Sequence, residues 1–304
     1  MQFIKETHID FIGKRRIAII ISAILIVVGI ASLLIHGGPN YSIDFTGGTS
    51  LQVRFEKPIR VSEIRDILSN IGLGNSEIKE FSTGNELLIR LQQQENMEDP
   101  SEKVIEGLQT QLADNPLEIR QKETVGPRIG SELRRAAIWA VLVSLALILA
   151  YISYRFEFKF AVGAVVALFH DVLITLGIFS LLNYEISLSV VAAFLTIIGY
   201  SLNDTIVVFD RIRENLKSLR KEDVVTIFNT SINQTLSRTL LTSLTTFVVV
   251  NILFFFGGEV IHNFSFALVV GVIVGTYSSV FIASPVVVEW YLKTEGKKSK
   301  LSRK

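Results

Sequence analysis

Long apolar runs alternate with charged segments along the chain, and this alternation is the strongest structural signal in the sequence. Each run is close to the ~20 residues that a helix needs to cross a bilayer. The first run follows a basic cluster but is longer than the apolar core of a typical signal peptide, and no small-x-small cleavage site follows it, so an uncleaved anchor is expected. The pattern predicts six membrane-spanning helices, at about 17–36, 137–154, 160–182, 186–209, 240–257 and 264–292.

Lysine and arginine residues collect on one side of these spans. They precede the first span, separate the second from the third and the fourth from the fifth, and follow the sixth, whereas the loops 183–185 and 258–263 have none. The positive-inside rule therefore predicts that both termini are cytoplasmic. The predicted domains are a cytoplasmic N-terminal segment (1–16), a first span (17–36), an extracytoplasmic domain (37–135), a five-helix bundle (136–292) with a cytoplasmic loop at about 211–238, and a basic tail (293–304).

Residues 37–135 have the alternation of a small soluble α+β domain. Ser62 is a candidate N-cap for a helix ending at Gly72, Pro100 and Ser101 open a second helix, and 82–85 reads as a hairpin turn. The predicted strands are Thr49–Glu56, Glu77–Phe81, Leu87–Leu91 and Leu117–Thr124. The order β-α-β-β-α-β is typical of a ferredoxin-like fold, which by itself indicates no activity. The segment has no phosphate loop, metal-ligand cluster or nucleophile–base pattern, which favours a docking or handling module over an enzyme.

Composition excludes several classes of function. The chain has no cysteine, so disulfides, thiol redox chemistry and thiolate metal sites are ruled out. Its net charge of +1 gives no electrostatic support for nucleic-acid binding. Only 19% of its residues are charged, which is below the ~25% of a soluble globular protein and agrees with a membrane protein.

Two glycine-containing segments flank the predicted soluble domain, at 41–48 and 125–133. Glycine permits tight turns and close backbone approach, and proline stiffens a join. The segments are either plain linkers or a hinge about which the domain tilts, and the residue types do not decide between the two. The hinge candidates are Asp44, Gly47, Gly48, Gly126, Pro127 and Gly130.

Asp204 lies inside the fourth predicted span, where an ionised carboxylate costs roughly 3 kcal/mol on insertion scales. Such a residue is typical of ion, proton or substrate transport, although a structural pairing within the bundle is the alternative. Tyr200 shares its helix face and Asn203 is adjacent. Asp210 lies nearer the boundary and is expected to pair with Arg211 or Arg213.

Other polar residues fall within the spans. His170 and Asp171, near the middle of the third span, form either one step of a proton path or a packing contact, and as neighbours they are expected to point in different directions. Arg238 opens the fifth span and either reaches Asp204 or snorkels to the interface. Hydroxyl and amide side chains along the fifth span, among them Thr242 and Ser243, are candidates for hydrogen bonds across helices. The small residues Gly271, Gly275, Ser278 and Ser279 predict close packing in the last span.

Five stretches together resemble the SecF members of the SecD/SecF family of protein-export membrane proteins, in the RND superfamily. They are Ile43–Gly48, Val125–Leu133, His170–Asp171, Gly199–Asn215 and Gln234–Thr239. The resemblance covers nearly the whole chain, and the long motif of the fourth span is its most specific part.

This resemblance implies half of an RND-type helical bundle in the bacterial inner membrane, with Asp204 and Arg238 in a proton-conducting site. It implies that protons are the coupling ion, with no bond chemistry and no bound cofactor or metal. A SecD partner would supply another carboxylate, the pair would act with the SecYEG translocon on unfolded secretory polypeptides, and YajC and YidC are further candidate partners. The chain is expected to be a separate subunit rather than a fused SecD–SecF.

Two other functions stay open at this point. The first is one half of an RND-type exporter of small molecules or lipids, although such proteins have about twice as many spans and two large loops per chain. The second is a scaffold that conducts nothing and only holds partner membrane proteins together. A scaffold predicts that the intramembrane charges can be replaced if packing survives.

Overall fold

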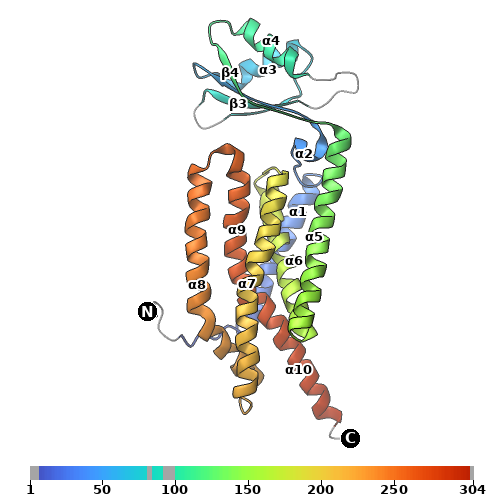
Figure 1. Cartoon of the computed structure of the whole chain (residues 1–304), viewed down its shortest axis with the longest axis vertical. Helices are drawn as coiled ribbons and strands as arrows, with labels where there is room; N and C mark the ends of the chain where they lie inside the picture. The colour runs from blue at the N-terminus through green and yellow to red at the C-terminus, as the bar shows by residue number, and fades with distance from the viewer. Residues whose placement is uncertain (1–6, 81–83, 92–99, 302–304) are drawn as a thin grey trace. The chain divides into compact units, whose positions relative to one another are not determined.

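The computed structural model describes residues 7–80, 84–91 and 100–301, and the chain divides into two compact units. One comprises Met1–Asn40 with Ala140–Lys304, and the other Tyr41–Trp139. Within the described part of the chain, six helices are long and apolar enough to cross a membrane (Figure 1). They are α1 (Arg15–Ile35), α5 (Pro127–Arg155), α6 (Phe158–Leu181), α7 (Leu188–Ser218), α8 (Val224–Phe256), and the continuous segment formed by α9 (His262–Ser278), the π-helical η2 (Ser279–Ala283) and the start of α10 (Ser284–Leu301).

The six predicted spans are confirmed, but four helices extend well past them, because α5 begins at Pro127, α7 ends at Ser218, α8 begins at Val224 and α10 ends at Leu301. Residues 211–238, predicted as a loop from their charge, are helical except at 219–223. A charged segment marks the end of the apolar span but not the end of the helix. The backbone hydrogen bonds of a helix are made within the helix and do not depend on the lipid. The helix α8 begins where the side chain of Asp223 accepts a hydrogen bond from the backbone N–H of Thr226 at 2.7 Å. A short 3₁₀ turn, η1 (Glu259–Ile261), precedes α9.

The bundle unit is most buried along α6 and the α9–α10 segment, whereas α5 is almost entirely exposed. Helix α7 packs on α8 and α9, and α1 packs on α6. A Cβ built on Gly29 of α1 would lie 2.7 Å from Cα of Gly177, so only glycine permits this approach of α1 to α6. A Cβ on Gly275 would lie 2.9 Å from Cβ of Ser201, which confirms close packing of α9 against α7.

The second unit contains a four-stranded antiparallel sheet in the order β2-β3-β1-β4, which confirms the predicted ferredoxin-like topology. Alternate residues of β1 and β3 point into a core completed by one face of each helix. The predicted end of the second strand at Phe81 and most of the following turn lie outside the described residues. The elements are α2 (Ile43–Thr46), β1 (Gly48–Phe55), α3 (Val61–Asn70), β2 (Glu77–Glu80), β3 (Glu86–Leu91), α4 (Ser101–Gln111) and β4 (Leu117–Val125).

The predicted N-cap of α3 is wrong by two residues. The helix begins at Val61, its N-cap is Arg60 in an extended conformation, and no side chain caps it. Val61 packs against the same core that buries Ile64 and Leu68, so burial of this face draws the first turn in ahead of Ser62. Where packing and capping favour different first residues, burial of an amphipathic face contributes more to the stability of a helix than one N-cap hydrogen bond does.

Candidate functional site

Asp204 is buried in α7, with only 3% of its surface exposed. The hydroxyl of Ser243 on α8 donates to its Oδ2 at 3.2 Å, and the hydroxyl of Thr276 on α9 lies 2.7 Å from Ser243 Oγ. Thr276 Oγ1 is also 2.7 Å from the carbonyl oxygen of Val272. Two hydroxyl groups thus connect the carboxylate on α7 to the backbone of α9. This agrees with the hydrogen bonds across helices that were predicted for the polar residues of the fifth span.

The structure does not bring Arg238 into contact with Asp204. Arg238 is exposed, and no ion pair joins the two side chains among the described residues. The reason is geometric, because Ser243, which does contact Asp204, comes five residues later on α8. Five residues correspond to about 7.5 Å along a helix and about 140° around it, so Arg238 and Ser243 lie on different faces of α8. Arg238 still acts on Asp204 through its charge, without an ion pair.

Three other residues of the predicted site are more exposed than Asp204, although one of them, Thr242, also hydrogen-bonds its carboxylate. Asn203 and Thr242 are exposed, and Tyr200 is half-buried with its hydroxyl donating to the carbonyl oxygen of Thr242 at 3.2 Å. Together with Arg238 they form a polar face, named here the α7–α8 polar face. This face contains a formal charge and several hydrogen-bonding groups in helices apolar enough to span a membrane.

The predicted pairing of Asp210 with Arg211 or Arg213 is wrong. Asp210 lies 3.6 Å from Nη2 of Arg155, which ends α5. Arg211 instead binds Glu214, one turn further along the same helix, at 2.9 Å. Consecutive helical residues point about 100° apart, so Asp210 and Arg211 cannot face each other.

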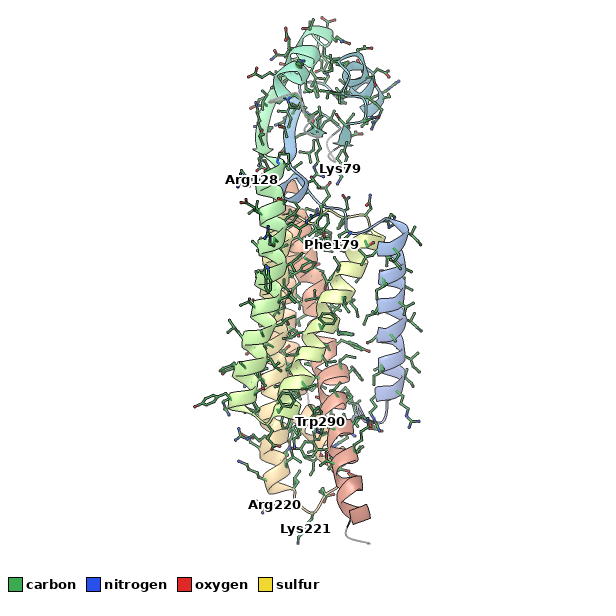
Figure 2. The ribbon with its side chains drawn as sticks, turned by 90° about the vertical axis from the view of Figure 1, so that its right-hand side faces the viewer. Lys79, Arg128, Phe179, Arg220, Lys221 and Trp290 are labelled. Atoms are coloured by element: carbon green, nitrogen blue, oxygen red, sulfur yellow. The ribbon has the colours of Figure 1, made fainter. Side chains whose placement is uncertain are left out.

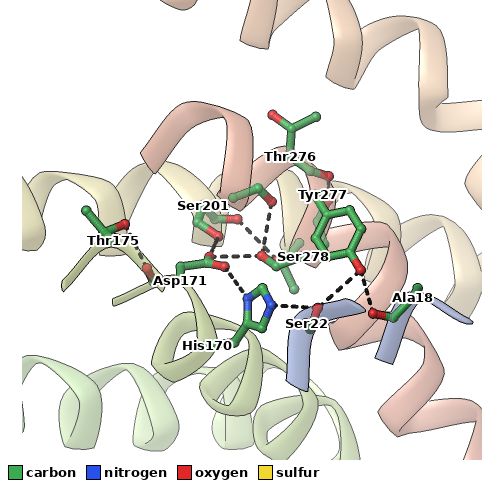
Figure 3. A network of polar contacts seen from close by, with 12 residues as sticks. Ala18, Ser22, His170, Asp171, Thr175, Ser201, Thr276, Tyr277 and Ser278 are labelled. Carbon is green, nitrogen blue, oxygen red and sulfur yellow. Dashed lines mark hydrogen bonds and ion pairs between the residues drawn. The ribbon is translucent and has the colours of Figure 1, made fainter. Parts of the chain in front are cut away.

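A second buried carboxylate, Asp171 on α6, has a complete set of partners (Figure 3). Its Oδ1 lies 2.9 Å from Nδ1 of His170. Its Oδ2 accepts hydrogen bonds from Ser201 of α7 at 2.6 Å and Ser278 of α9 at 2.9 Å. The expectation that these two neighbours point in different directions is wrong, because the two side chains bend toward each other and bond. This cluster joins three helices.

His170 extends the same network to α1 (Figure 3). Its Nε2 is 3.0 Å from Oγ of Ser22, which is 3.1 Å from the hydroxyl of Tyr277, and that hydroxyl donates to the carbonyl oxygen of Ala18 at 2.8 Å. The pattern of residues along the chain did not single out Ser22, Ser201 or Tyr277. Their one shared signal is a hydroxyl in an apolar run, and many such residues bond only to their own helix.

The two glycine segments that flank the sheet pack against each other within their unit. A Cβ on Gly47 (φ +77°) would lie 2.7 Å from Cα of Pro127, and a Cβ on Gly130 would lie 3.0 Å from the carbonyl carbon of Phe45. Gly48 pairs with Val125 in the ladder of β1 and β4. Asp44 lies in the first turn of α2, whereas a Cβ on Gly126 would meet open space. The segments therefore form a packed junction rather than two independent linkers, and whether the junction bends stays a prediction.

Within the described ranges, no group of three or more His, Asp or Glu side chains is placed to hold a metal ion. Among the described residues, the buried titratable side chains of the bundle unit are three carboxylates, Asp171, Asp204 and Glu185, and the imidazole of His170. Asp171, Asp204 and His170 are each hydrogen-bonded to hydroxyl groups.

Comparison with known proteins places the chain in a family. Residues 105–293 match the family described as protein export membrane protein SecD/SecF, C-terminal, and residues 32–59 match the SecD/SecF GG motif. A protein translocase subunit SecF from Thermodesulfovibrio yellowstonii is 48% identical over 94% of this chain and 96% of the relative. One from Desulfurispirillum indicum is 50% identical over 93% and 92%.

Two solved structures of SecDF resemble the chain. The SecDF of Thermus thermophilus, a translocon-associated membrane protein, has a TM-score of 0.85 and 42% identity over 94% of this chain. A SecDF in the super-membrane-facing form has a TM-score of 0.72 and 39% identity over 99%. The chain spans 39% and 41% of those two proteins. On the family match and the SecF relatives, this multi-pass membrane protein belongs to the SecD/SecF family of protein export membrane proteins.

Proposed function

We propose that the chain is a SecF-like subunit that, with SecD, uses the proton gradient to promote export of unfolded polypeptides through the SecYEG translocon of the bacterial inner membrane. The relatives' names and the SecDF structures support the role in export. A separate SecD subunit would supply the part of the solved SecDF chains that has no counterpart here. The lysine and arginine distribution supports cytoplasmic termini and an extracytoplasmic sheet domain. YajC and YidC are proposed only as further partners.

The observation that carries this proposal is the hydrogen-bond chain beginning at Asp204. Three contacts link Asp204, Ser243, Thr276 and the carbonyl oxygen of Val272. An ionised Asp204 leaves two hydroxyl protons for these three contacts, because a carboxylate only accepts and each hydroxyl donates once. A protonated Asp204 supplies the third proton and completes the chain. The site can therefore hold either state with the same side-chain positions, as a group that loads and unloads a proton requires.

The α7–α8 polar face supports the need for a partner. Arg238, Asn203 and Thr242 are exposed in this chain alone, and lipid tails cannot satisfy a guanidinium or an amide. We place SecD on this face, where a carboxylate of the partner would pair with Arg238. Protonation of Asp204 would then change the charge balance beside that pair and favour a rearranged bundle.

The network of His170 and Asp171 holds protons under the same counting rule. The contacts from His170 Nε2 through Ser22 and Tyr277 to the carbonyl oxygen of Ala18 need three protons, and the two hydroxyls supply only two. A proton on Nε2 completes these three contacts, and another proton, shared between Nδ1 and Asp171, completes the contact between the two side chains. The pair is then neutral overall, which the low dielectric of a membrane favours. We assign this pair to stabilising the bundle and to a step of the proton path that depends on Asp204.

The test is proton-dependent export by the complete complex reconstituted in vesicles. Asp204→Asn keeps the size of the side chain but cannot ionise, and it is expected to abolish stimulation by the proton gradient while ATP-driven translocation and co-purification with SecD persist. Asp210→Asn, on the same helix but paired with Arg155, is the matched control and should retain stimulation. Full stimulation in Asp204→Asn, or in the double variant with Arg238→Met, would instead support a scaffold.

A further inference from the structure

A groove of about 600 Å³ opens between α1, α6 and α10 and shares no residue with the Asp204 chain or the Asp171 network. Its walls are apolar, from Ile19, Val162 and Val286. Its polar lining lies on α10, where Glu289 and Lys293 flank Trp290, which Figure 2 labels on the lower part of the bundle. The volume is within the ~300–1,000 Å³ typical of small-molecule pockets.

The polar end of this groove coincides with the ends of three apolar helices. Helix α1 begins at Arg15 and α6 at Phe158, and Lys293 is the first lysine or arginine after α9 begins. Trp290 lies one turn before Lys293, the position where aromatic residues gather at a membrane interface. Ile19 and Val162 each lie four residues after the first residue of their helix, which is about 6 Å along the helix axis. Val286 lies seven residues before Lys293, which is about 10 Å along the axis of α10. The charged end is thus at headgroup level and the walls are at acyl-chain depth.

The charges in the groove favour an anion from outside the protein. Glu289 Oε1 accepts from Nε of Arg15 at 2.9 Å, so its negative charge is compensated. Lys159 at the same level is already engaged by Glu157 at 2.6 Å and by the ring of Tyr291 at 3.4 Å. Lys293 is exposed and has no ion pair among the described residues. Among the described residues that line the groove, Lys293 is therefore a cation without an ion-pair partner. It lies at the headgroup end of the groove, and the walls further into the membrane are apolar.

We propose that this groove binds one anionic phospholipid of the cytoplasmic leaflet, with its phosphate at Lys293 and an acyl chain along Ile19, Val162 and Val286. A soluble anion would use the cation but not the walls, and a zwitterionic lipid would use the walls with less electrostatic gain. Basic pockets between membrane helices on the cytoplasmic side are typical sites for anionic headgroups. The site ties α1 to α10, two helices that are distant in sequence.

The test is titration of the purified full chain with phosphatidylglycerol, with phosphatidylcholine as the reference, followed by native mass spectrometry. The wild-type chain should retain one phosphatidylglycerol preferentially. Lys293→Gln removes one cation near the surface and should weaken that binding about five-fold. Val286→Trp should weaken phosphatidylglycerol binding because the larger side chain fills the apolar part of the groove. If Val286→Trp does not fold, Val162→Phe is used in its place. Lys217→Gln, an exposed basic residue at the end of α7, is the matched control and should bind as wild type.

Several outcomes would overturn the proposal. Equal retention of phosphatidylglycerol and phosphatidylcholine would remove the role of the headgroup. Equal effects of Lys293→Gln and Lys217→Gln would indicate general surface attraction. Displacement of the lipid by inorganic phosphate at millimolar concentration would indicate a site for a free anion. Unchanged binding in Val286→Trp would show that the acyl chain does not lie along the apolar walls of the groove.

Discussion

The two buried aspartates of the bundle should respond unequally to the same substitution. Asp171 accepts hydrogen bonds from two other helices and contacts His170, whereas Asp204 is bonded by Ser243 and Thr242 of α8. Replacing Asp171 with alanine removes the acceptor that joins Ser201 and Ser278 to α6. After the matching change at Asp204, Ser243 still bonds Thr276, and Thr242 still bonds carbonyl oxygens of its own helix. We therefore expect Asp171→Ala to destabilise the fold more than Asp204→Ala does.

The magnitude follows from the bonds lost. Hydrogen bonds between membrane helices average about 0.6 kcal/mol and reach about 1.7 kcal/mol. Asp171→Ala removes the acceptor of both Ser201 and Ser278, so it should cost about 1.2 kcal/mol at the average value and about 3.4 kcal/mol at the upper one. Asp204→Ala should cost about 0.6 kcal/mol through its bond to Ser243, which at 3.2 Å is already long.

The assay is reversible unfolding of the full chain in mixed micelles by SDS, followed by circular dichroism. Wild type, both single variants and Ser278→Ala are compared at one pH and one lipid composition. Ser278→Ala should reproduce part of the Asp171→Ala loss, because it removes one of the same bonds. Equal destabilisation by Asp171→Ala and Asp204→Ala would refute the assignment of a stabilising role to Asp171 that Asp204 lacks.

Three further outcomes are expected. Nitrogen-15 NMR of labelled protein, with His170→Gln assigning the signal, should show Nε2 of His170 protonated; an unprotonated Nε2 would contradict the proton count. Gly47→Ala puts a methyl group 2.7 Å from Cα of Pro127 at a positive φ and should cost at least ~1 kcal/mol, measured as faster proteolysis of the sheet unit. Hydrogen bonds from Thr226, first from its hydroxyl and then from its backbone N–H, hold the pKa of Asp223 below its ordinary value. The carboxylate therefore stabilises α8 fully above about pH 4 and loses this effect as the pH falls through the folded-state pKa. Asp223→Ala should cost about 1 kcal/mol at pH 7 and less in acid, whereas Asp223→Asn keeps the cap; an Asp223→Ala loss that is unchanged in acid would refute the assignment.

Sequence periodicity was sufficient for the architecture. Six apolar runs predicted the spanning helices, and the alternation in 37–135 predicted the strand and helix order of the sheet domain. Both signals are local, because apolar burial repeats along a single element. The same signals placed helix ends poorly, since α7 and α8 continue into charged segments where no change of period marks the membrane boundary.

The partners of the polar residues were much less predictable. The sequence singled out Asp204 and the hydroxyls of the fifth span, but not the bonds from Ser201 and Ser278 to Asp171. Those contacts depend on the rotation of three helices about their axes, which a one-dimensional pattern does not fix. The same holds for Asp210, whose partner Arg155 comes from a helix 55 residues earlier in the chain.

The central claim is that Asp204 itself gains a proton in the working complex. Difference infrared spectroscopy after a pH decrease, on the complex with SecD in membranes, measures this directly. The account predicts a protonated-carboxyl band in the wild type and in Asp210→Asn that is missing from Asp204→Asn. An identical carboxyl spectrum in Asp204→Asn and wild type would contradict it.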